Sequence, residues 1–276
     1  MNLDHAQSFQ TIDRDDMLGH IRSLPDQLDT AWRLGMNSEM KEMKPVSRIL
    51  VAGMGGSAIG ADLLAAYLKP YSTVPVIVYR DYGLPAWAKQ ADTLVVASSH
   101  SGNTEETLSA YQEARQHNVP RMVVCTGGRL AELANEDGVN LWQFEHHGQP
   151  RSAVGFSFGL LLSLLVRLGL VTGQEKMIQN AVVVMQAQQE KIEIQQPMLN
   201  NPAKEMALRF SGKFPVIIGA DLLAPVARRW KGQINELAKH WAQAEELPEA
   251  DHNLLAGCEQ PHQLGHETRL IFLSAN

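Results

Sequence analysis

Two short turns in the sequence gather small and hydroxyl-bearing residues. Residues 53–58 read Gly-Met-Gly-Gly-Ser-Ala, and residues 98–104 read Ser-Ser-His-Ser-Gly-Asn-Thr. In the second turn, Ser99, Ser101 and Thr104 supply three hydroxyls around a glycine, where a helix is expected to begin. Because the start of a helix presents unpaired N–H groups and a partial positive charge, hydroxyls placed there can hold a phosphate dianion without a lysine. The second turn therefore predicts a phosphate-binding site.

Each turn also has a simpler interpretation. Residues 53–58 match the G-x-G-x-x-A pattern of dinucleotide-binding folds, and Asp81 lies near the acidic position of those folds. The same glycines would suit a tight turn that binds nothing. Serine or asparagine in residues 98–104 could act only as a helix cap. Capping alone, however, does not call for Ser-x-Ser-Gly-Asn-Thr.

The two turns follow expected strands in an alternating pattern of strands and helices. Short β-branched runs alternate with longer amphipathic stretches, which is typical of βαβ units and a parallel sheet. We predict strands at residues 48–52, 76–79, 93–97, 122–125 and 139–144, and helices at residues 57–68 and 103–117. Five such strands predict one doubly wound domain.

The rest of the chain predicts a second α/β unit with fewer strands. We expect connecting helices at 152–170 and 174–195, helices at 201–210 and 222–241, and strands at 215–219 and 269–273. About two strands are too few to cover both faces of a parallel sheet, so we expect the sequence to be a fragment. The predicted divisions are a helical arm interrupted by Pro25 (1–44), a first domain (45–150), connecting helices (151–196) and a truncated second domain (197–276).

The composition argues against several classes of protein. The 276 residues include 24 Lys and Arg against 30 Asp and Glu, which leaves no basic surface for nucleic acid. Cys125 and Cys258 are too few for a disulfide framework, and the N-terminus lacks the features of a signal peptide. Residues 153–170 approach the length of a membrane span, but Arg167 and several serines favour a buried core helix. We expect a soluble, cytoplasmic α/β enzyme without membrane or nucleic-acid partners.

Five motifs, in order along the chain, resemble those of one family. The segments GMGGSAIGAD (53–62) and SSHSGNTEET (98–107) look like the two signatures of the sugar isomerase (SIS) domain. The segments QPRSAVG (149–155), RWKGQINELAK (229–239) and PEADHN (248–253) are similar to motifs of the bifunctional phosphoglucose/phosphomannose isomerases. The resemblance implies two SIS-type doubly wound parallel-sheet domains, the second of them incomplete.

The resemblance also implies an activity and a set of site residues. The family interconverts glucose 6-phosphate, and mannose 6-phosphate, with fructose 6-phosphate by moving a proton through an enediol, which requires a phosphate anchor and a general base. It assigns the base to Glu236, ring opening to His252 and stabilisation of the enediolate to Arg151. It assigns phosphate binding to Gly55, Gly56, Ser57, Ser99, Ser101 and Thr104. It further implies a homodimer in which His252 reaches the neighbouring subunit's site, and no cofactor.

The sequence departs from the family at several positions. His100 stands where tyrosine is common, and no lysine follows Lys239, although the family has a ring-opening lysine near the end of its second domain. We therefore expect this chain alone to be a poor isomerase. A phosphosugar-binding module without turnover and a dinucleotide-binding oxidoreductase remain alternatives. Without the resemblance, Glu236 would be interpreted as a solvent-exposed glutamate on a helix, Arg151 as a surface residue and His252 as a turn residue.

The histidines and cysteines predict no metal site. His262 and His266 have helical spacing, but Pro261 and Gly265 make a regular helix doubtful there. His146 and His147 are adjacent and would point apart on a strand. Cys125 is expected to be a small core residue rather than a nucleophile, because no group that would lower its pKa is evident.

Overall fold

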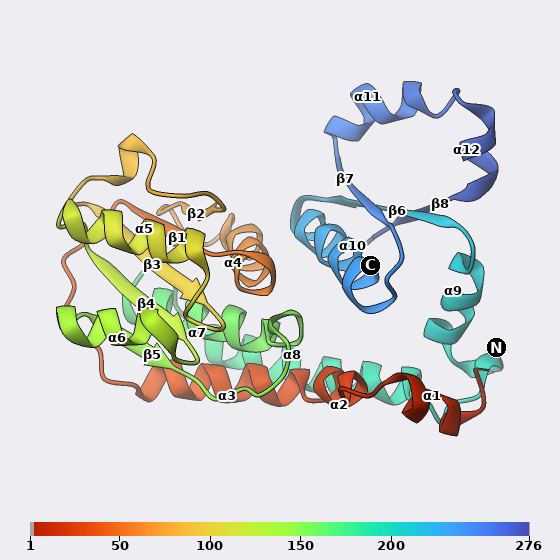
Figure 1. Ribbon diagram of the computed structural model, residues 1–276, viewed down its shortest axis with the longest axis horizontal. Coiled ribbons are helices and arrows are strands. Elements are labelled where there is room, and N and C mark those ends of the chain that lie inside the picture. The colour runs from red at the N-terminus through yellow and green to blue at the C-terminus, as the bar shows by residue number, and fades with distance from the viewer. Residues whose placement is uncertain (1–2, 276) are drawn as a thin grey trace. The chain divides into compact units, whose positions relative to one another are not determined.

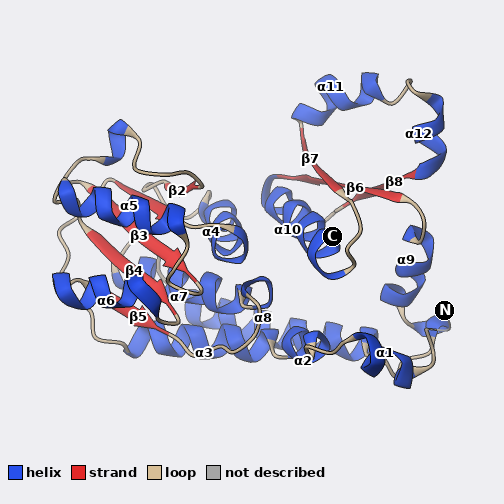
Figure 2. Ribbon diagram, in the orientation of Figure 1, coloured by secondary structure: helices blue, strands red, loops and turns tan. Residues whose placement is uncertain are grey.

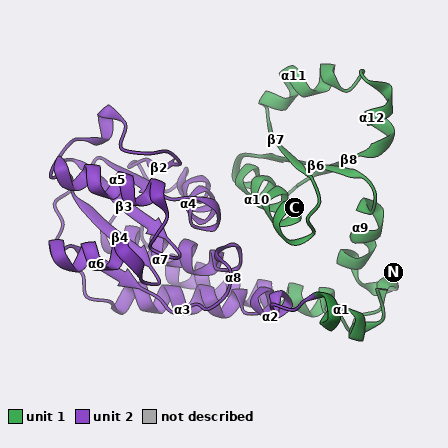
Figure 3. Ribbon diagram, viewed as in Figure 1, with its two compact units in different colours: residues 1–12, 187–276 green, residues 13–186 purple. Residues whose placement is uncertain are grey.

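The computed structural model describes residues 3–275, and the chain divides into two compact units. Residues 13–186 form the larger unit, and residues 187–276 together with 1–12 form the smaller one (Figure 3). The boundary lies inside helix α8 (Gln174–Ile192). Each unit is built around its own sheet (Figure 2).

A five-stranded parallel sheet forms the centre of the larger unit (Figure 1). Its strand order is β2-β1-β3-β4-β5, so the chain reverses its direction of winding between β1 and β3. Every strand predicted in this region is confirmed, and the first two have the predicted bounds. The strands are β1 (Arg48–Ala52), β2 (Val76–Tyr79), β3 (Thr93–Ser99), β4 (Arg121–Cys125) and β5 (Asn140–Gln143).

Helices cover both faces of this sheet, as expected of a doubly wound fold. Ile49 and Val51 pack into one layer, while Leu50 and Ala52 pack into the other, because successive side chains of a strand point to opposite faces. The first layer contains α3 (Leu24–Asn37), α4 (Gly55–Leu68) and α7 (Val154–Arg167), and the second contains α5 (Glu105–Gln116) and α6 (Gly128–Asp137). Helix α6 was not predicted from the sequence.

Helix α7 is the apolar segment that resembles a membrane span. It is buried between the sheet and α3, and the prediction of a core helix is confirmed. A β-carbon on Gly155 would lie 2.7 Å from the Gln27 side chain, and one on Gly159 would lie 2.7 Å from the Ala31 side chain, so glycine lets the two helices approach closely. The apolar circumference of α7 is thus covered within the chain. No helix in residues 3–275 is long and apolar enough to cross a membrane.

The predicted helical arm contains α2 (Met17–Arg22) followed by α3. Pro25 occupies the first turn of α3, a position where its missing N–H costs no helical hydrogen bond. Pro25 therefore begins a helix and does not interrupt one. The remaining short elements are α1 (Ala6–Ile12) and the 3-10 turns Ala86–Ala88, Pro150–Ser152, Met198–Asn200 and Asp221–Leu223.

The smaller unit has a three-stranded parallel sheet in the order β7-β6-β8. The expectation of about two strands was therefore wrong, because β7 reads Gln-Ala-Glu-Glu-Leu and has no β-branched residue to reveal it. The predicted helix 222–241 ends early, at Leu237, and Lys239, two residues later, takes a positive φ of 52°. The elements are β6 (Phe214–Ala220), β7 (Gln243–Leu247), β8 (Thr268–Phe272), α9 (Pro202–Phe210), α10 (Ala224–Leu237), α11 (Glu249–Gly257) and α12 (His262–Glu267).

Both strands predicted in this region are confirmed, at residues 215–219 and 269–273, and β8 lies parallel beside β6. Ile271 packs against the small core around Ile217, together with residues of α10. On the opposite face, Leu270 is 48% exposed and Phe272 is 63% exposed. One face of this strand is therefore partly uncovered in the smaller unit.

Candidate active site

The two polar turns meet at the carboxyl edge of the larger sheet. One follows β1 and the other follows β3, and these strands are neighbours in the sheet. In open α/β sheets, ligands bind outside the carboxyl ends of the strands where the winding reverses. We call Gly55, Gly56, Ser57, Ser99, Ser101 and Thr104 the phosphate cradle.

The first turn of the phosphate cradle depends on glycine for close packing. A β-carbon on Gly56 would lie 2.3 Å from the carbonyl oxygen of Pro150, so only glycine lets the start of α4 approach that segment. Gly55 has a φ of 49°, which glycine adopts without strain. The Ser57 hydroxyl accepts a hydrogen bond from the N–H of His100 at 3.1 Å, which links the two turns and leaves its own hydrogen to donate.

The second turn is held by its own hydroxyls. Ser99 Oγ lies 2.8 Å from Thr104 Oγ1 and accepts from the N–H of Gly102 at 3.1 Å. Ser99 is buried, so its hydroxyl shapes the turn, whereas Ser101 is exposed at its rim. Ser101 Oγ accepts from the N–H of Asn103 at 3.2 Å. In the part of the chain that the structure describes, no side chain caps α5 at Thr104, which leaves the first N–H groups of that helix to an anion.

The turn after β4 supports the phosphate cradle, a role that was not predicted from the sequence. Gly102 has a φ of 68°, and a β-carbon there would lie 1.8 Å from the carbonyl oxygen of Gly127. Asn103 Oδ1 accepts from the N–H of Arg129 at 2.9 Å, at the start of α6. The pair Gly127-Gly128 directly after a predicted strand was the available signal, since such pairs mark tight βα turns.

Arg151 lies at the same edge of the sheet, in the 3-10 turn Pro150–Ser152. A β-carbon on Gly56 would lie 3.2 Å from the backbone nitrogen of Arg151, which places this segment against the phosphate cradle. Ser152 holds the turn, because its hydroxyl donates to the Gln149 carbonyl at 2.7 Å and its own carbonyl accepts from Gln27 Nε2 at 2.9 Å. The larger unit therefore brings together Arg151 and the six residues predicted to bind phosphate.

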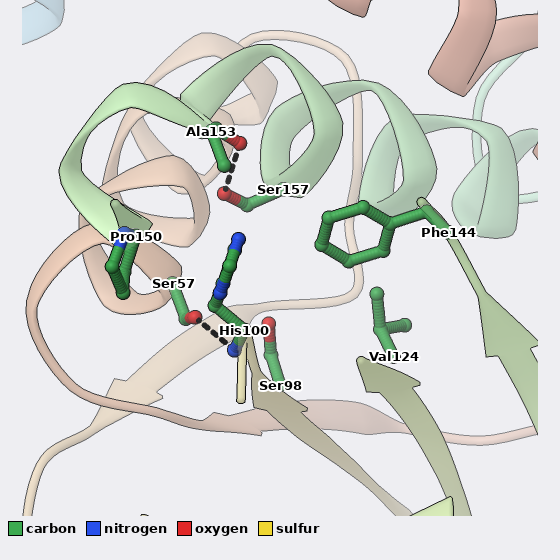
Figure 4. Close-up of a pocket in the computed structure, with 8 residues that line it drawn as sticks. All are labelled: Ser57, Ser98, His100, Val124, Phe144, Pro150, Ala153 and Ser157. Atoms are coloured by element: carbon green, nitrogen blue, oxygen red, sulfur yellow. Dashed lines mark hydrogen bonds between the residues drawn. The ribbon is translucent and has the colours of Figure 1, made fainter. Parts of the chain in front are cut away.

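A small pocket beside the phosphate cradle is lined by His100, which pairs with His146. From the sequence, His146 was considered only as a metal ligand and His100 only as a departure from the family. His100 Nε2 lies 2.9 Å from His146 Nδ1. Burial lowers the pKa of His100, and burial with the charges of neighbouring histidines lowers the pKa of His146 to about 4. Figure 4 shows the His100 ring pointing into the pocket. The pocket is lined by Ser57, Ser98, His100, Val124, Phe144, Pro150, Ala153 and Ser157.

The other two predicted catalytic residues belong to the smaller unit. Glu236 lies in the last turn of α10 and is exposed, and Lys239 Nζ donates to its backbone carbonyl at 2.7 Å. Burial lowers the pKa of Arg229, on the same helix, to about 10, while the charge of Glu236 raises it. His252 is exposed on α11.

Glu236 and His252 lie at opposite edges of the small sheet. His240 Nε2 donates to the Lys213 carbonyl at 2.6 Å, which fixes the end of α10 beside the start of β6. His252 instead follows the carboxyl end of β7, which runs parallel to β6. Strands of this length separate the two edges by about 15 Å at roughly 3.3 Å per residue.

The structure also tests the remaining cysteine and histidine interpretations. Cys125 is fully buried, and burial raises its pKa to about 11, which confirms a core residue. His262 and His266 do lie on a helix, the short α12, so the doubt about a helix there was wrong. Across residues 3–275, no three His, Cys, Asp or Glu side chains are grouped so as to hold a metal ion.

Comparisons with known proteins agree with this fold. The family described as the SIS domain matches residues 42–166, and the family described as the bacterial phospho-glucose isomerase C-terminal SIS domain matches residues 199–276. The C-terminal domain of glucosamine-fructose-6-phosphate aminotransferase from Francisella tularensis superposes with a TM-score of 0.67 at 16% identity, covering 94% of this chain and 76% of that chain. Tagatose-6-phosphate ketose/aldose isomerase from Escherichia coli superposes with a TM-score of 0.64 at 16% identity, covering 92% and 71%. Fold and site together define a protein of the SIS class.

Relatives of known sequence narrow the class to one family. The bifunctional phosphoglucose/phosphomannose isomerase of Caldicellulosiruptor bescii is 39% identical over 90% of this chain and 74% of its own length. The protein of the same name from Aquifex aeolicus is 35% identical over 80% of this chain and 65% of its own length. The chain belongs to the bifunctional phosphoglucose/phosphomannose isomerase family, whose members are phosphosugar isomerases. The comparisons do not favour a dinucleotide-binding oxidoreductase.

Proposed function

We propose that the chain interconverts glucose 6-phosphate, and also mannose 6-phosphate, with fructose 6-phosphate. The observation that carries this proposal is the phosphate cradle at the reversal of the larger sheet, with Arg151 beside it, in a chain 39% identical to a named isomerase. A phosphorylated hexose offers a dianion for the phosphate cradle at one end and the reacting C1 and C2 at the other. We also propose the cytoplasm as the location, because Cys125 and Cys258 are both free thiols.

Each proposed residue has a distinct task in the reaction. Ser57, Ser101, Thr104 and the first N–H groups of α4 and α5 would bind the phosphate, while buried Ser99 would hold the turn in shape. Glu236 would move the proton between C2 and C1 as the general base, and His252 would assist ring opening. The guanidinium of Arg151 would stabilise the enediolate, because it stays charged and presents a fixed fork of donors.

A coupled assay that starts from fructose 6-phosphate tests the proposed reaction. Formation of glucose 6-phosphate and mannose 6-phosphate supports it, whereas tight binding of fructose 6-phosphate without turnover supports a binding module. A relative from Sulfolobus acidocaldarius, 34% identical over 79% of this chain, is named D-glucosamine-6-phosphate 4-epimerase. Glucosamine 6-phosphate is therefore a second substrate to test, and its conversion in place of fructose 6-phosphate would contradict the proposal.

Removing a hydroxyl from the phosphate cradle should weaken binding. We expect Ser101→Ala and Thr104→Ala each to weaken the binding of fructose 6-phosphate by about 1.5–3 kcal/mol, because each hydroxyl would donate to a charged ligand. Calorimetric titration measures this change. Ser8→Ala, which removes an exposed hydroxyl outside the phosphate cradle, is the control. Equal affinity for all four proteins would show that phosphate binds elsewhere.

We further propose that the active form is a homodimer. Glu236 and His252 of one chain lie at opposite edges of the small sheet, which favours a site that takes these two residues from different chains. A twofold symmetric dimer can combine Glu236 of one subunit with His252 of the other. The apolar surface of α7 gives no support to this proposal, since α3 covers it.

Mixing two inactive variants should restore activity if the site is shared. We expect Glu236→Gln and His252→Ala to be inactive alone and to regain about a quarter of the wild-type rate after equal mixing, because about half the dimers are then mixed and one of their two sites is intact. The isomerase assay after subunit exchange measures the recovery. Light scattering that shows a monomer at assay concentration, or an absence of recovery, would contradict the dimer.

A further inference from the structure

The histidine pair connects two segments of the larger unit that the proposed function needs in register. His100 belongs to the turn that carries Ser99, Ser101 and Thr104, and His146 belongs to residues 144–151, which end in Arg151. The bond between His100 Nε2 and His146 Nδ1 is 2.9 Å long. It joins the turn that follows β3 to the segment that follows β5, two strands away in the sheet.

The His100 end of this bond is fixed by the phosphate cradle itself. The N–H of His100 donates to Ser57 Oγ at 3.1 Å. Its carbonyl accepts from the N–H of Thr126 at 2.9 Å and from the Thr126 hydroxyl at 2.7 Å. Because the backbone of His100 is held on both sides, its ring has a defined position at the pocket (Figure 4).

The His146 end is fixed by the packing of rings. The ring of His146 lies 5.3 Å from that of His20 on α2 and 5.9 Å from that of Phe156 on α7, between centroids. A β-carbon on Gly148 would lie 2.4 Å from the His20 ring, so the backbone after His146 passes directly over that ring. Two residues later, Pro150 meets Gly56 of the phosphate cradle.

Burial favours the neutral form of both rings. Burial is the first cause that lowers the pKa of both rings, and the groups that act on His146 are His100, His20 and His147. When both rings are neutral, one ring can donate its N–H and the other can accept with its lone pair. This arrangement accounts for the 2.9 Å hydrogen bond between His100 Nε2 and His146 Nδ1. Protonation of both rings would replace this attraction with repulsion.

We propose that His100 and His146 are positioning residues that set Arg151 in register with the phosphate cradle. This inference rests on the proposed function, because it deepens the same site. Neither histidine needs to touch the reacting atoms of the sugar. Their bond fixes the distance between the group that anchors the phosphate and the group that stabilises the enediolate at the other end of the substrate.

The test compares a ligand that needs only the phosphate cradle with one that also needs Arg151. Inorganic phosphate is the first probe, and 6-phosphogluconate, which carries a carboxylate at C1, is the second. His146→Phe keeps an aromatic ring but removes the nitrogen that bonds His100. We expect it to change the Kd of phosphate less than about twofold, to raise that of 6-phosphogluconate about tenfold, and to lower kcat by about 10- to 100-fold, since misplacement by ~1 Å can cost that much.

Two matched variants separate positioning from packing. His146→Asn keeps a polar atom near the place of Nδ1 and should restore the Kd of 6-phosphogluconate to within about threefold of wild type. His147→Phe alters the adjacent residue, which is exposed and bonded to Glu145, and should change nothing. In an Arg151→Gln background, His146→Phe should have no further effect on 6-phosphogluconate, because the two residues act in one chain of contacts.

Several outcomes would overturn the inference. If His146→Phe weakens the binding of both probes equally, His146 merely supports the phosphate cradle. If the effects of His146→Phe and Arg151→Gln on 6-phosphogluconate binding add, the two residues act independently. If His146→Phe does not fold, His100→Leu breaks the same bond from the other side and is judged by the same ratio of affinities. The binding ratio needs no turnover. If the wild-type protein proves inactive while the ratio changes as expected, the proposed function fails, and only the positional link between His146 and Arg151 is supported.

Discussion

Replacing Glu236 by glutamine is expected to lower the isomerisation rate by about two to four orders of magnitude, the usual contribution of a general base. Glutamine keeps the shape of the side chain and can still accept a hydrogen bond, but it cannot take up the proton that moves between C2 and C1. Glu236 is exposed at the end of α10, so its replacement should not disturb the core around Ile217. The kcat of the coupled assay measures the loss.

The binding of substrate analogues and a second glutamate complete this experiment. We expect the Kd of 6-phosphogluconate to change less than about threefold in Glu236→Gln, because a base acts mainly in the transition state. Glu205→Gln is the control, since Glu205 is also exposed on a helix of the smaller unit and pairs with Arg209 at 2.6 Å. If Glu236→Gln keeps more than about a tenth of the activity, another group is the base.

Replacing Gly102 by alanine is expected to damage both the stability and the phosphate binding of the larger unit. The left-handed backbone of Gly102, with a φ of 68°, costs a residue with a β-carbon about 1–2 kcal/mol. The added carbon would also lie 1.8 Å from the Gly127 carbonyl oxygen, which must move, at a further cost of about 1–3 kcal/mol. Urea unfolding should therefore show a loss of about 2–5 kcal/mol in the free energy of unfolding.

Gly169→Ala separates backbone strain from steric contact. Gly169 has a φ of 72°, but no described heavy atom lies within 4 Å of the place of its β-carbon. We expect Gly169→Ala to lose only about 1–2 kcal/mol and to keep its affinity for inorganic phosphate. Gly102→Ala should lose at least about tenfold in that affinity, because the turn carrying Ser101 and Thr104 shifts. Equal behaviour of the two variants would show that contact with Gly127 does not shape the phosphate cradle.

Sequence pattern predicted the sheet of the larger unit well, because β1 to β4 are mostly apolar runs with β-branched residues, and the central strands β1 and β3 are almost wholly buried. Residues 48–52 and 76–79 are strands with the predicted bounds. Such runs follow from a local requirement, the burial of every side chain of a central parallel strand. The same reasoning failed for β7, where the polar segment Gln243–Leu247 forms an edge strand of exposed and half-buried residues, none of them fully buried.

Part of the site was also predicted, because its polar turns lie directly after recognisable strands. The hydroxyls and glycines of residues 53–58 and 98–104 appear directly after strands, and chain order alone places them at strand ends. Their roles in binding phosphate stay predictions, as do those of Glu236, His252 and Arg151. The structure adds that Ser99 is buried and bonded to Thr104, so the hydroxyls of the phosphate cradle are not equivalent.

Which turns become neighbours depends on strand order, and the sequence carries only a local record of burial and backbone preference. Placing β1 beside β3 brings Ser57 to His100, although the turn of Ser57 follows the first strand and that of His100 the third. The contacts of Gly56 with Pro150, and of His100 with His146, likewise arise only when the sheet is assembled. In the smaller unit, the parallel pairing of β6 and β7 puts Glu236 and His252 at opposite edges, although only a short segment of chain separates them. Such contacts join residues far apart in the chain. The conformational entropy lost when those loops close is offset only by the packing of the whole domain.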